Sequence, residues 1–297
     1  MELNIEPQDK MRIFFNKKRF SFYMEPKIIF LGTAGDAIVV GKQLRASGGI
    51  IIQVDNTQLH IDPGPGALTM ASMYGINLRN TNAILVSDNH INHCNDINAV
   101  INAMTAGGEE PKGVLICCKS VVERIEDQKE LTPFLMPHYK QLLDKTIILE
   151  RGNKTNVNEI DIKATYTKHS DHAAVGFRIL SSKFNLGYTG DTGFSKKLID
   201  DFNDIDMLIL NVQNPASYKK DHQLNSDDAI KIILDVKPKL AVITHFGIKM
   251  LEADVLSEVR RIHLATGIQV IAAKDGMSIN PVSYSVQLRQ KTLNLFK

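Results

Sequence analysis

The sequence predicts an α+β protein: a four-layer αββα sandwich of two mixed β-sheets packed face to face, with helices on both outer faces. Three observations favour this class. Short apolar runs joined by tight turns form a block of strands between residues 27 and 62. After residue 82 apolar runs alternate with helical patterns, and a similar succession repeats in the second half of the chain. Elements that are apolar on one side need stacked layers to bury that side.

The composition is that of a globular chain. Its 297 residues, 43% of them hydrophobic, can bury one large core or two small ones. We find no internal repeat and no low-complexity linker, and we expect a single domain over residues 1–297. Residues 1–26 are expected to form an N-terminal extension, an edge strand or an arm over the core. The basic and aromatic run at residues 17–23 leaves open a contact with a phosphate-bearing partner.

Charge and cysteine content exclude several classes of protein. Lys and Arg number 35 and Asp and Glu 33, so no broad basic surface argues for bulk nucleic-acid binding. No apolar run approaches the roughly 18 residues of a membrane span, and the N-terminal stretch lacks an apolar signal core. Three cysteines cannot make a full disulfide set, and Cys117 and Cys118 lie in an apolar run. We therefore expect a cytoplasmic protein without a membrane partner.

The first block of the chain is a set of strands. We expect them at residues 27–32, 50–54 and 57–62. Asp55-Asn56 is a hairpin signal, and Pro63-Gly64-Pro65-Gly66 ends the third strand sharply. Asp62 therefore stands at a strand end before a rigid turn, where it caps the turn or orients a metal ligand.

The rest of the chain mixes strands with helices. In its first part we expect strands at residues 82–86, 113–118 and 146–149 and helices at residues 96–104 and 119–126. Asn95 or Asp96 can cap the first of these helices. In the second part we expect strands at residues 159–167, 175–180, 184–188, 206–210, 239–244, 268–272 and 277–280, and helices from Asn225 or Ser226 to Leu234 and at residues 250–263.

Residues 86–96 carry the densest group of chemically active side chains. His90 and His93 lie three residues apart, with Asp88 before them and Asn92 between them. The stretch follows a buried strand and precedes a helix, so it forms a loop of the kind on which functional groups concentrate. Such a loop can turn several side chains to one point, as a metal ion requires.

Later strand ends carry further candidate ligands. His169 follows the strand at residues 159–167, and Asp191 and His245 follow two later strands. A single histidine or aspartate at a strand end is commonly a loop or turn residue. Because such residues recur at separate strand ends, the pattern indicates one shared metal site.

These motifs resemble those of the metallo-β-lactamase fold family over residues 27–280. The family has a strand ending in Asp-Pro-Gly, a loop His-x-His-x-Asp-His, and single His, Asp and His ligands at later strand ends. The matching segments are Ile61-Asp62-Pro63-Gly64, Asp88-Asn89-His90-Ile91-Asn92-His93, Lys168-His169-Ser170, Thr189-Gly190-Asp191-Thr192 and Thr244-His245-Phe246-Gly247. The resemblance implies this family's sandwich, one or two divalent metal ions and hydrolytic activity.

Two loop positions depart from the family pattern. Asp88 stands where the family has its first histidine, and Asn92 replaces the loop aspartate. A neutral amide is a poor ligand for a divalent transition metal, so we expect one well-occupied metal site and one weak or empty site. If Asp62 faces Asp88, two carboxylates meet, which disfavours ionisation of both.

The resemblance also implies how the ligands divide. It gives a first metal site of Asp88, His90 and His169 and a second of His93 and His245, with Asp191 bridging them. Two histidines with one carboxylate suit zinc, the ion we expect, and Mn²⁺ or Fe²⁺ also fit this set.

The segment around His222 resembles the tRNase Z and related phosphodiesterase branch of the family. There the matching histidine contacts the scissile phosphate, so the resemblance implies that His222 is a general acid. Asp191 would hold the metal bridge, and Asn92 occupies the position that orients the attacking water. The long tRNA-gripping arm of tRNase Z has no evident counterpart, so we do not carry over tRNA as the substrate. We expect a small anionic or phosphodiester substrate; a nucleic-acid partner stays open, although no basic surface supports it.

Two other interpretations stay open. A catalytically impaired member of the family could keep the fold and one metal ion and serve as a binding or assembly subunit. An iron site of two histidines and one carboxylate could support redox chemistry instead. For any of these we expect a homo-oligomer.

Overall fold

The computed structural model describes residues 25–128 and 130–288. Most of the N-terminal extension expected at residues 1–26 lies outside this part of the chain, and only Glu25 and Pro26 are seen, leading into the first strand. Among the described residues, no helix combines the length and the apolar character that crossing a membrane requires.

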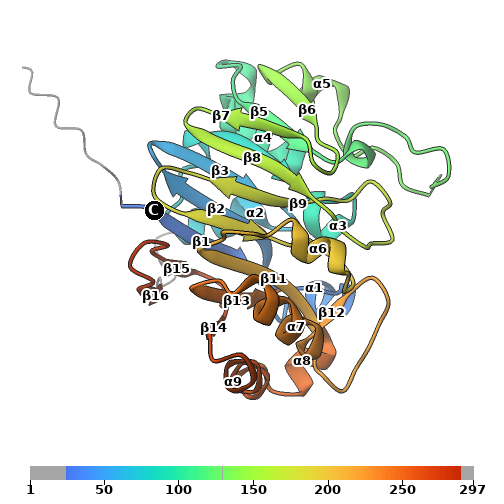
Figure 1. The fold of residues 1–297 in the computed structure, drawn as a ribbon. Coiled ribbons are helices and arrows are strands. Elements are labelled where there is room, and N and C mark those ends of the chain that lie inside the picture. Colours follow the sequence, from blue (N-terminus) through green and yellow to red (C-terminus); the bar gives the residue numbers. More distant parts are fainter. Residues whose placement is uncertain (1–24, 129, 289–297) are drawn as a thin grey trace, which may run out of the picture.

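Two β-sheets form the centre of the fold (Figure 1). The first has the strand order β16-β15-β1-β2-β3-β4-β5-β6, and the second β14-β13-β11-β10-β9-β8-β7, with β12 paired to β11. Both are mixed, because antiparallel hairpins adjoin parallel strands in each. The first sheet comprises β1 Lys27–Gly32, β2 Ser47–Val54, β3 Thr57–Ile61, β4 Thr81–Val86, β5 Val114–Cys117, β6 Lys145–Ile148, β15 Met277–Ile279 and β16 Val286–Leu288. The second comprises β7 Lys154–Val157, β8 Ile160–Thr165, β9 Gly176–Leu180, β10 Asn185–Tyr188, β11 Met207–Asn214, β12 Leu224–Asn225, β13 Leu240–Thr244 and β14 Gln269–Ala272.

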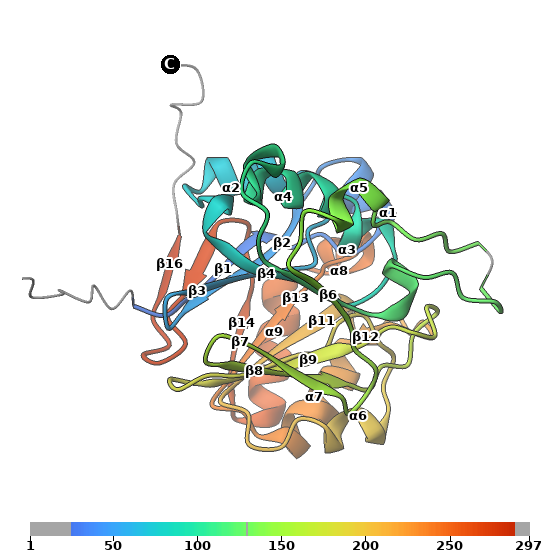
Figure 2. The same ribbon diagram turned by 90° about the horizontal axis from the view of Figure 1, so that it is seen from above.

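Helices cover both outer faces of the paired sheets. Figure 2 shows α2, α4 and α5 outside the first sheet and α6 and α7 outside the second, so the predicted four-layer αββα order is confirmed. Helix α9 packs against α7 and β14. The helices are α1 Ala37–Gly41, α2 Ala67–Met73, α3 Ile91–Cys94, α4 Ile97–Met104, α5 Pro137–Lys140, α6 Lys196–Asp200, α7 Ser226–Val236, α8 Ile248–Glu252 and α9 Val255–Thr266, with 3-10 turns at Leu78–Asn80, Ala106–Gly108 and Lys119–Val121.

Strand β11 shows how the layers are held together. Met207 and Ile209 belong to the core cluster that joins the two sheets, whereas Leu208 and Leu210 belong to the cluster shared with the outer helices. Successive strand residues point to opposite faces, so a continuous apolar run serves both interfaces. All three cysteines are buried and free, as expected for thiols in a core.

Several element boundaries differ from the predictions. The helix predicted at residues 250–263 is divided into α8 and α9, because Asp254 takes a left-handed backbone (φ 62°) and caps α9 through the amide of Leu256. The helix predicted at residues 119–126 is only a 3-10 turn. The strand predicted at residues 206–210 extends as β11 to Asn214. By contrast, α7 begins as predicted, with Asn225 accepting a hydrogen bond from the amide of Asp228.

Helix α2 was not predicted, because its cap comes from a distant part of the chain. The amides of Gly66 and Ala67 donate to Oδ2 of Asp96, at 3.0 and 2.9 Å. Asp96 precedes α4 but makes no side-chain cap bond to it. A carboxylate at a helix N-terminus satisfies free amides whether or not it is local in sequence. The cap therefore also ties the segment after Asp62 to the loop of residues 86–96.

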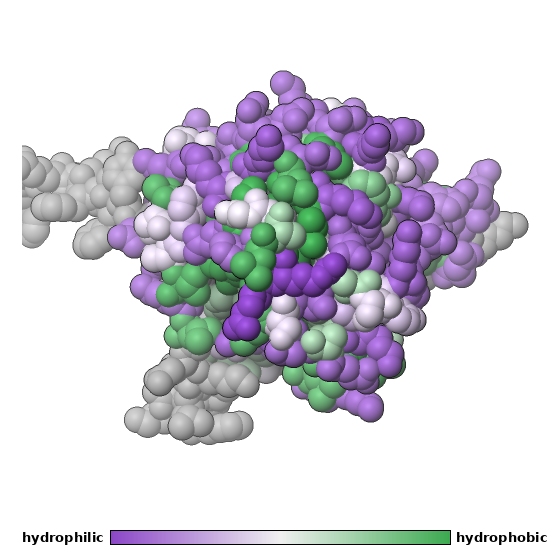
Figure 3. Space-filling model, turned by 60° about the horizontal axis from the view of Figure 1, so that its bottom comes forward, coloured by the Kyte–Doolittle hydropathy of each residue, from purple (hydrophilic) through white to green (hydrophobic). Residues whose placement is uncertain are grey.

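The outer side of the C-terminal helices is partly apolar. Figure 3 looks onto the underside of Figure 1, where α8 and α9 run, and apolar side chains gather near its middle among hydrophilic ones. On α9, Leu256 and Leu264 are exposed, with Arg260 and Arg261 between them. None of the described residues covers these leucines.

Candidate metal centre

The predicted ligands lie at one edge of the sandwich, where strands of both sheets end. Strands β3 and β4 run parallel, so Asp62 and the loop after Val86 leave the first sheet at the same edge. In the second sheet β10, β11 and β13 run parallel and carry Asp191 and His245 to their carboxyl ends. Strand β8 runs in the direction of β10, since both pair antiparallel with β9, and it delivers His169 beside them. Side chains from sequence-distant loops thus converge.

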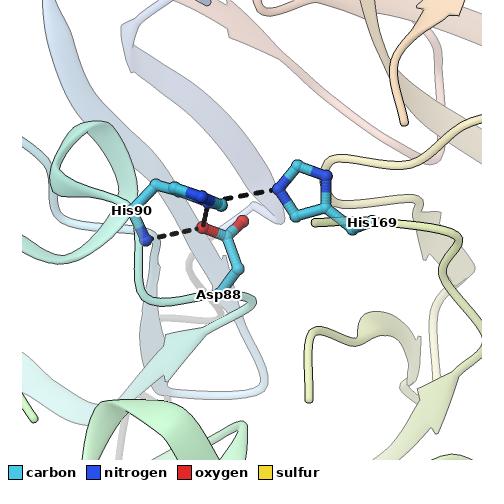
Figure 4. A group of neighbouring side chains, drawn as sticks. All are labelled: Asp88, His90 and His169. Atoms are coloured by element: carbon cyan, nitrogen blue, oxygen red, sulfur yellow. Dashed lines mark hydrogen bonds and ion pairs between the residues drawn. The ribbon is translucent and has the colours of Figure 1, made fainter. Parts of the chain in front are cut away.

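Asp88, His90 and His169 form the first ligand group (Figure 4). One ligand atom from each lies within 4.8 Å of the others. Nδ1 of His90 is 2.9 Å from Oδ1 of Asp88 and 3.1 Å from Nε2 of His169. The backbone amide of His90 also donates to Oδ1 of Asp88, at 2.9 Å, which fixes the carboxylate toward the ring.

His93, Asp191 and His245 form the second ligand group. Nε2 of His245 lies 3.0 Å from one Asp191 oxygen, and Nε2 of His93 lies 3.4 Å from the other. The two histidine rings stack with their centroids 4.8 Å apart. All three residues are buried, so their charges are removed from water.

Both groups fit a divalent cation. Nε2 of His93 is buried and has no hydrogen-bond partner among the described residues, although carboxylate oxygens of Asp191 and Asp88 approach it. In the first group, two ring nitrogens face each other at 3.1 Å, which requires a proton or a cation between them. Imidazole nitrogens with carboxylate oxygens are the donors that zinc and related transition metals take in proteins.

The charges of the second group also favour a bound cation. Burial alone would raise the pKa of Asp191, but His245 and His93 hold that pKa well below its ordinary value. Burial would lower the pKa of His93, yet the carboxylates of Asp88, Asp191 and Asp62 hold it well above its ordinary value. The site therefore concentrates negative charge that a cation can balance.

Asp62 supports the second group rather than opposing Asp88. Its Oδ2 lies 2.9 Å from Nδ1 of His93 and accepts hydrogen bonds from the hydroxyls of Ser87 and Tyr188, at 2.7 and 2.6 Å. The Ser87 hydroxyl also lies 3.2 Å from Asp88, so a donor stands between the two carboxylates. The expectation of a directly facing carboxylate pair is wrong. With Nδ1 of His93 held as the donor, Nε2 is left free for a ligand role.

The sequence patterns did not indicate the polar wall behind the second group, which we define as the buried side chains of Tyr188 and Asn211. Nδ2 of Asn211 donates to Oδ1 of Asp191 at 2.8 Å and approaches the Tyr188 hydroxyl at 3.2 Å. Since Tyr188 donates to Asp62, a chain of buried polar groups links the acceptor of His93 to the carboxylate of Asp191. The only sequence signal was position: Tyr188 ends a predicted strand, and Asn211 directly follows another.

Asp171 joins the two loops that carry the first group. It is buried, and its Oδ2 accepts from the amide of Asn89 at 3.0 Å and from the hydroxyl of Ser120 at 2.5 Å. Asn89 directly precedes His90, and Asp171 lies two residues after His169. This bond therefore sets the spacing of two ligand-bearing loops.

The two remaining predicted site residues adjoin the groups without belonging to them. Nδ2 of Asn92 lies 3.3 Å from Nε2 of His245, beside the second group. The backbone carbonyl of His222 lies 3.2 Å from Nδ1 of His169, so it accepts from that ring and leaves Nε2 for the first group. The backbone at Asn92 is closely packed, since a Cβ at Gly64 would stand 2.1 Å from its carbonyl oxygen.

Comparison with known proteins identifies the family of this chain. The sequence matches the family described as the beta-lactamase superfamily domain over residues 57–246. It is 33% identical over 269 residues to the uncharacterized protein MJ1374 of Methanocaldococcus jannaschii, covering 89% of this chain and 99% of that protein. The chain therefore belongs to the β-lactamase superfamily.

Solved structures share its fold. The metallo-β-lactamase fold protein YhfI from Bacillus subtilis superposes with a TM-score of 0.69 at 20% identity, over 85% of this chain and 98% of that chain. The short form of human tRNase Z gives a TM-score of 0.62 at 16% identity, over 85% and 98% of the two chains. The fold is the metallo-β-lactamase fold, as the motifs predicted.

Proposed function

We propose that this protein is a metal-dependent hydrolase that cleaves a phosphodiester or a related anionic ester. The observation that carries the proposal is the pair of ligand groups, each with two histidines and one aspartate whose ligand atoms lie within 4.8 Å. The shared fold of human tRNase Z supports the phosphodiester as substrate class. Zinc is the proposed ion, and the same donors suit Mn²⁺ or Fe²⁺.

The chain's own residues divide the work around the ions. Divalent ions held in the two groups would make water a nucleophile at neutral pH and polarise the ester oxygen. Asp191 balances charge in the second group, where Asn211 holds one of its oxygens. Asn92 can orient a water molecule by hydrogen bonding but cannot take its proton. His222, whose backbone lies against His169, is the proposed donor of a proton to the leaving group.

The rim of the site favours an anionic substrate. Lys219 and Lys220 are exposed in the loop that carries His222. Lys168, beside His169, lies 3.9 Å from Asp221 in the same loop, so the two rim segments approach each other. Cationic side chains at the mouth of a site raise the local concentration of anions.

A second candidate function is a non-catalytic metal-binding subunit. One observation favours it: the amide of Asn92 stands against His245 where the family pattern has a carboxylate. An amide there weakens the water-positioning machinery while leaving both ligand groups assembled.

Metal analysis followed by hydrolysis of bis(4-nitrophenyl) phosphate with Zn²⁺, Mn²⁺ or Fe²⁺ tests both candidates. We expect bound metal and metal-dependent turnover, reduced at least about a hundredfold in His90→Ala, since even changes around a metal's ligands cost up to that factor. His138→Ala, an exposed histidine on α5 outside both groups, is the matched control and should keep full turnover. Bound metal without turnover of any phosphoester or ester substrate would favour the second candidate, and absence of bound metal would overturn both.

A further inference from the structure

Asp88 lies between the two ligand groups. Its Oδ1 is 2.9 Å from Nδ1 of His90, in the first group, and its Oδ2 is 3.7 Å from Nε2 of His93, in the second. The side chain is fully buried. One carboxylate therefore presents a different oxygen to each group.

We infer that Asp88, and not Asp191 alone, is a ligand shared by both cation sites. The inference rests on the proposed metal-dependent function. Both oxygens of Asp191 are engaged within the second group, at 3.0 Å from His245 and 3.4 Å from His93. Among the described ion pairs, none joins Asp191 to His90 or His169. The bridging position that the family resemblance assigned to Asp191 is thus occupied at least as well by Asp88.

The local backbone fixes Asp88 in this orientation. The amide of His90 donates to Oδ1 at 2.9 Å, and the hydroxyl of Ser87 approaches Oδ2 at 3.2 Å. Rotation of the carboxylate would break the bond from the His90 amide to Oδ1, whereas the Ser87 hydroxyl donates to Asp62 at 2.7 Å and only lies beside Oδ2. A side chain with a single ligand atom facing the centre could serve only one group at a time.

The two positions at which the loop departs from the family pattern then compensate for each other. Asn92 removes a carboxylate from beside the second group, and Asp88 returns one through Oδ2. The centre keeps two carboxylates, Asp88 and Asp191, facing four histidines. The second site consequently binds a cation more tightly than the replacement of a carboxylate by the Asn92 amide alone would suggest.

Zinc binding by variants that isolate one group at a time tests this assignment. In a His169→Ala background the first group is broken, and the remaining Zn²⁺ affinity reports on the second. We expect Asp88→Asn to lower that affinity at least about tenfold, because partners even outside the ligand shell contribute 10–100-fold. His138→Ala in the same background, an exposed position outside both groups, is the matched control and should leave the affinity unchanged. In a His245→Ala background, Asp88→Asn should weaken the first group as well.

The outcomes separate this inference from the proposed function. An unchanged affinity of His169→Ala/Asp88→Asn relative to His169→Ala would overturn the shared-ligand role while leaving a metal-binding hydrolase intact. A full-length wild-type protein that binds no Zn²⁺, Mn²⁺ or Fe²⁺ would instead overturn the proposed function itself. If a double variant does not fold, Asp88→His gives a second measurement. One ring nitrogen cannot face both groups, so the Zn²⁺ affinity of the second group should fall at least about tenfold, and two ions retained at wild-type affinity would contradict the inference.

Discussion

The two ligand groups have the same composition but different surroundings. The His90 side chain of the first group is 34% exposed, whereas those of His93 and His245 in the second are 2% and 8% exposed. The second group is backed by Asp62, Tyr188 and Asn211, while the first is held mainly through loop contacts. Identical donors therefore meet different surroundings: both histidines of the second group are buried, whereas the first group includes one partly exposed histidine, His90.

The partial exposure of the first group also explains why side chains outside it hold the loops that carry its ligands. Asp171 joins the loops of the first group from behind, and Asp96 ties the loop of residues 86–96 to α2. An open ligand group must be positioned by its backbone, since few side chains surround it. A buried group is positioned by its own hydrogen-bonded neighbours.

Metal removal should give the largest effect and should act mainly through the buried group. Without cations, Asp88 and Asp191 remain buried beside histidines that must supply the balancing charge. Chelation from an ion concentration a thousandfold above Kd should lower the free energy of unfolding by about 4 kcal/mol, and Tm by roughly 10 °C. Thermal unfolding with EDTA, with Zn²⁺-saturated EDTA as control, measures this. The chelator effect should survive better in His90→Ala than in His245→Ala, and the reverse order would break the comparison.

His60 is a buried histidine outside both groups, so it reports how burial alone affects the pH dependence of stability. Burial holds the pKa of His60 down to about 4 against an ordinary value of 6.5, and its Nε2 lies 2.8 Å from the Gly48 carbonyl oxygen. Because the unfolded chain takes up this proton at higher pH than the folded one, stability falls as pH drops from 6.5 to 4. The loss is roughly 3 kcal/mol. Urea unfolding across this range should show a smaller slope for His60→Gln, and identical pH profiles would contradict the assignment.

Asp62→Asn should weaken the second group selectively. An asparagine cannot match the carboxylate as acceptor for Nδ1 of His93 and for the Ser87 and Tyr188 hydroxyls. We expect a loss of about 10–100-fold in Zn²⁺ affinity of that group. Competition with a chromogenic chelator in the His169→Ala background measures it. Asp127→Asn, which removes an exposed partner of His172, is the control. An equal loss at the first group would show that Asp62 does not discriminate between the two.

Tyr188→Phe should give the smallest effect. It removes a 2.6 Å hydrogen bond to Asp62 and leaves the ring in place. One lost buried hydrogen bond costs about 1 kcal/mol, so Tm should fall by a few degrees and Zn²⁺ affinity of the second group severalfold. Tyr218→Phe, at an exposed position, should change neither. A variant as stable as wild type would mean that the polar wall behind the second group is not required.

Much of the fold followed from local patterns. The hairpin at Asp55-Asn56, the cap at Asn225 and the strand ends before His169, Asp191 and His245 lie where periodicity and turn chemistry placed them. Helix α2 did not follow, because its cap, Asp96, is 29 residues away from Ala67. Nor did the division between α8 and α9, which depends on the left-handed backbone of Asp254.

The residues of the candidate site and their division into two groups were expected from the motifs and the family resemblance, whereas the contacts between carboxylates and rings were not. The family resemblance implied that Asp191 bridges the two sites and raised the possibility that Asp62 faces Asp88. The structure places the Ser87 hydroxyl between the two carboxylates and turns one oxygen of Asp88 to each group. No local rule indicates which oxygen of a carboxylate faces which ring.

The sequence by itself determined which candidate ligands this protein carries, their order along the chain, and the strand ends that hold them. These features are local, since each depends on a strand, a turn and a few adjacent residues. Only the tertiary structure decided how far each of these side chains is buried and which partners orient it. Those contacts join residues as distant as His93 with Asp62, 31 positions apart, and His245 with Asn92, 153 apart. They form only when the two sheets pack, because no segment contains both partners.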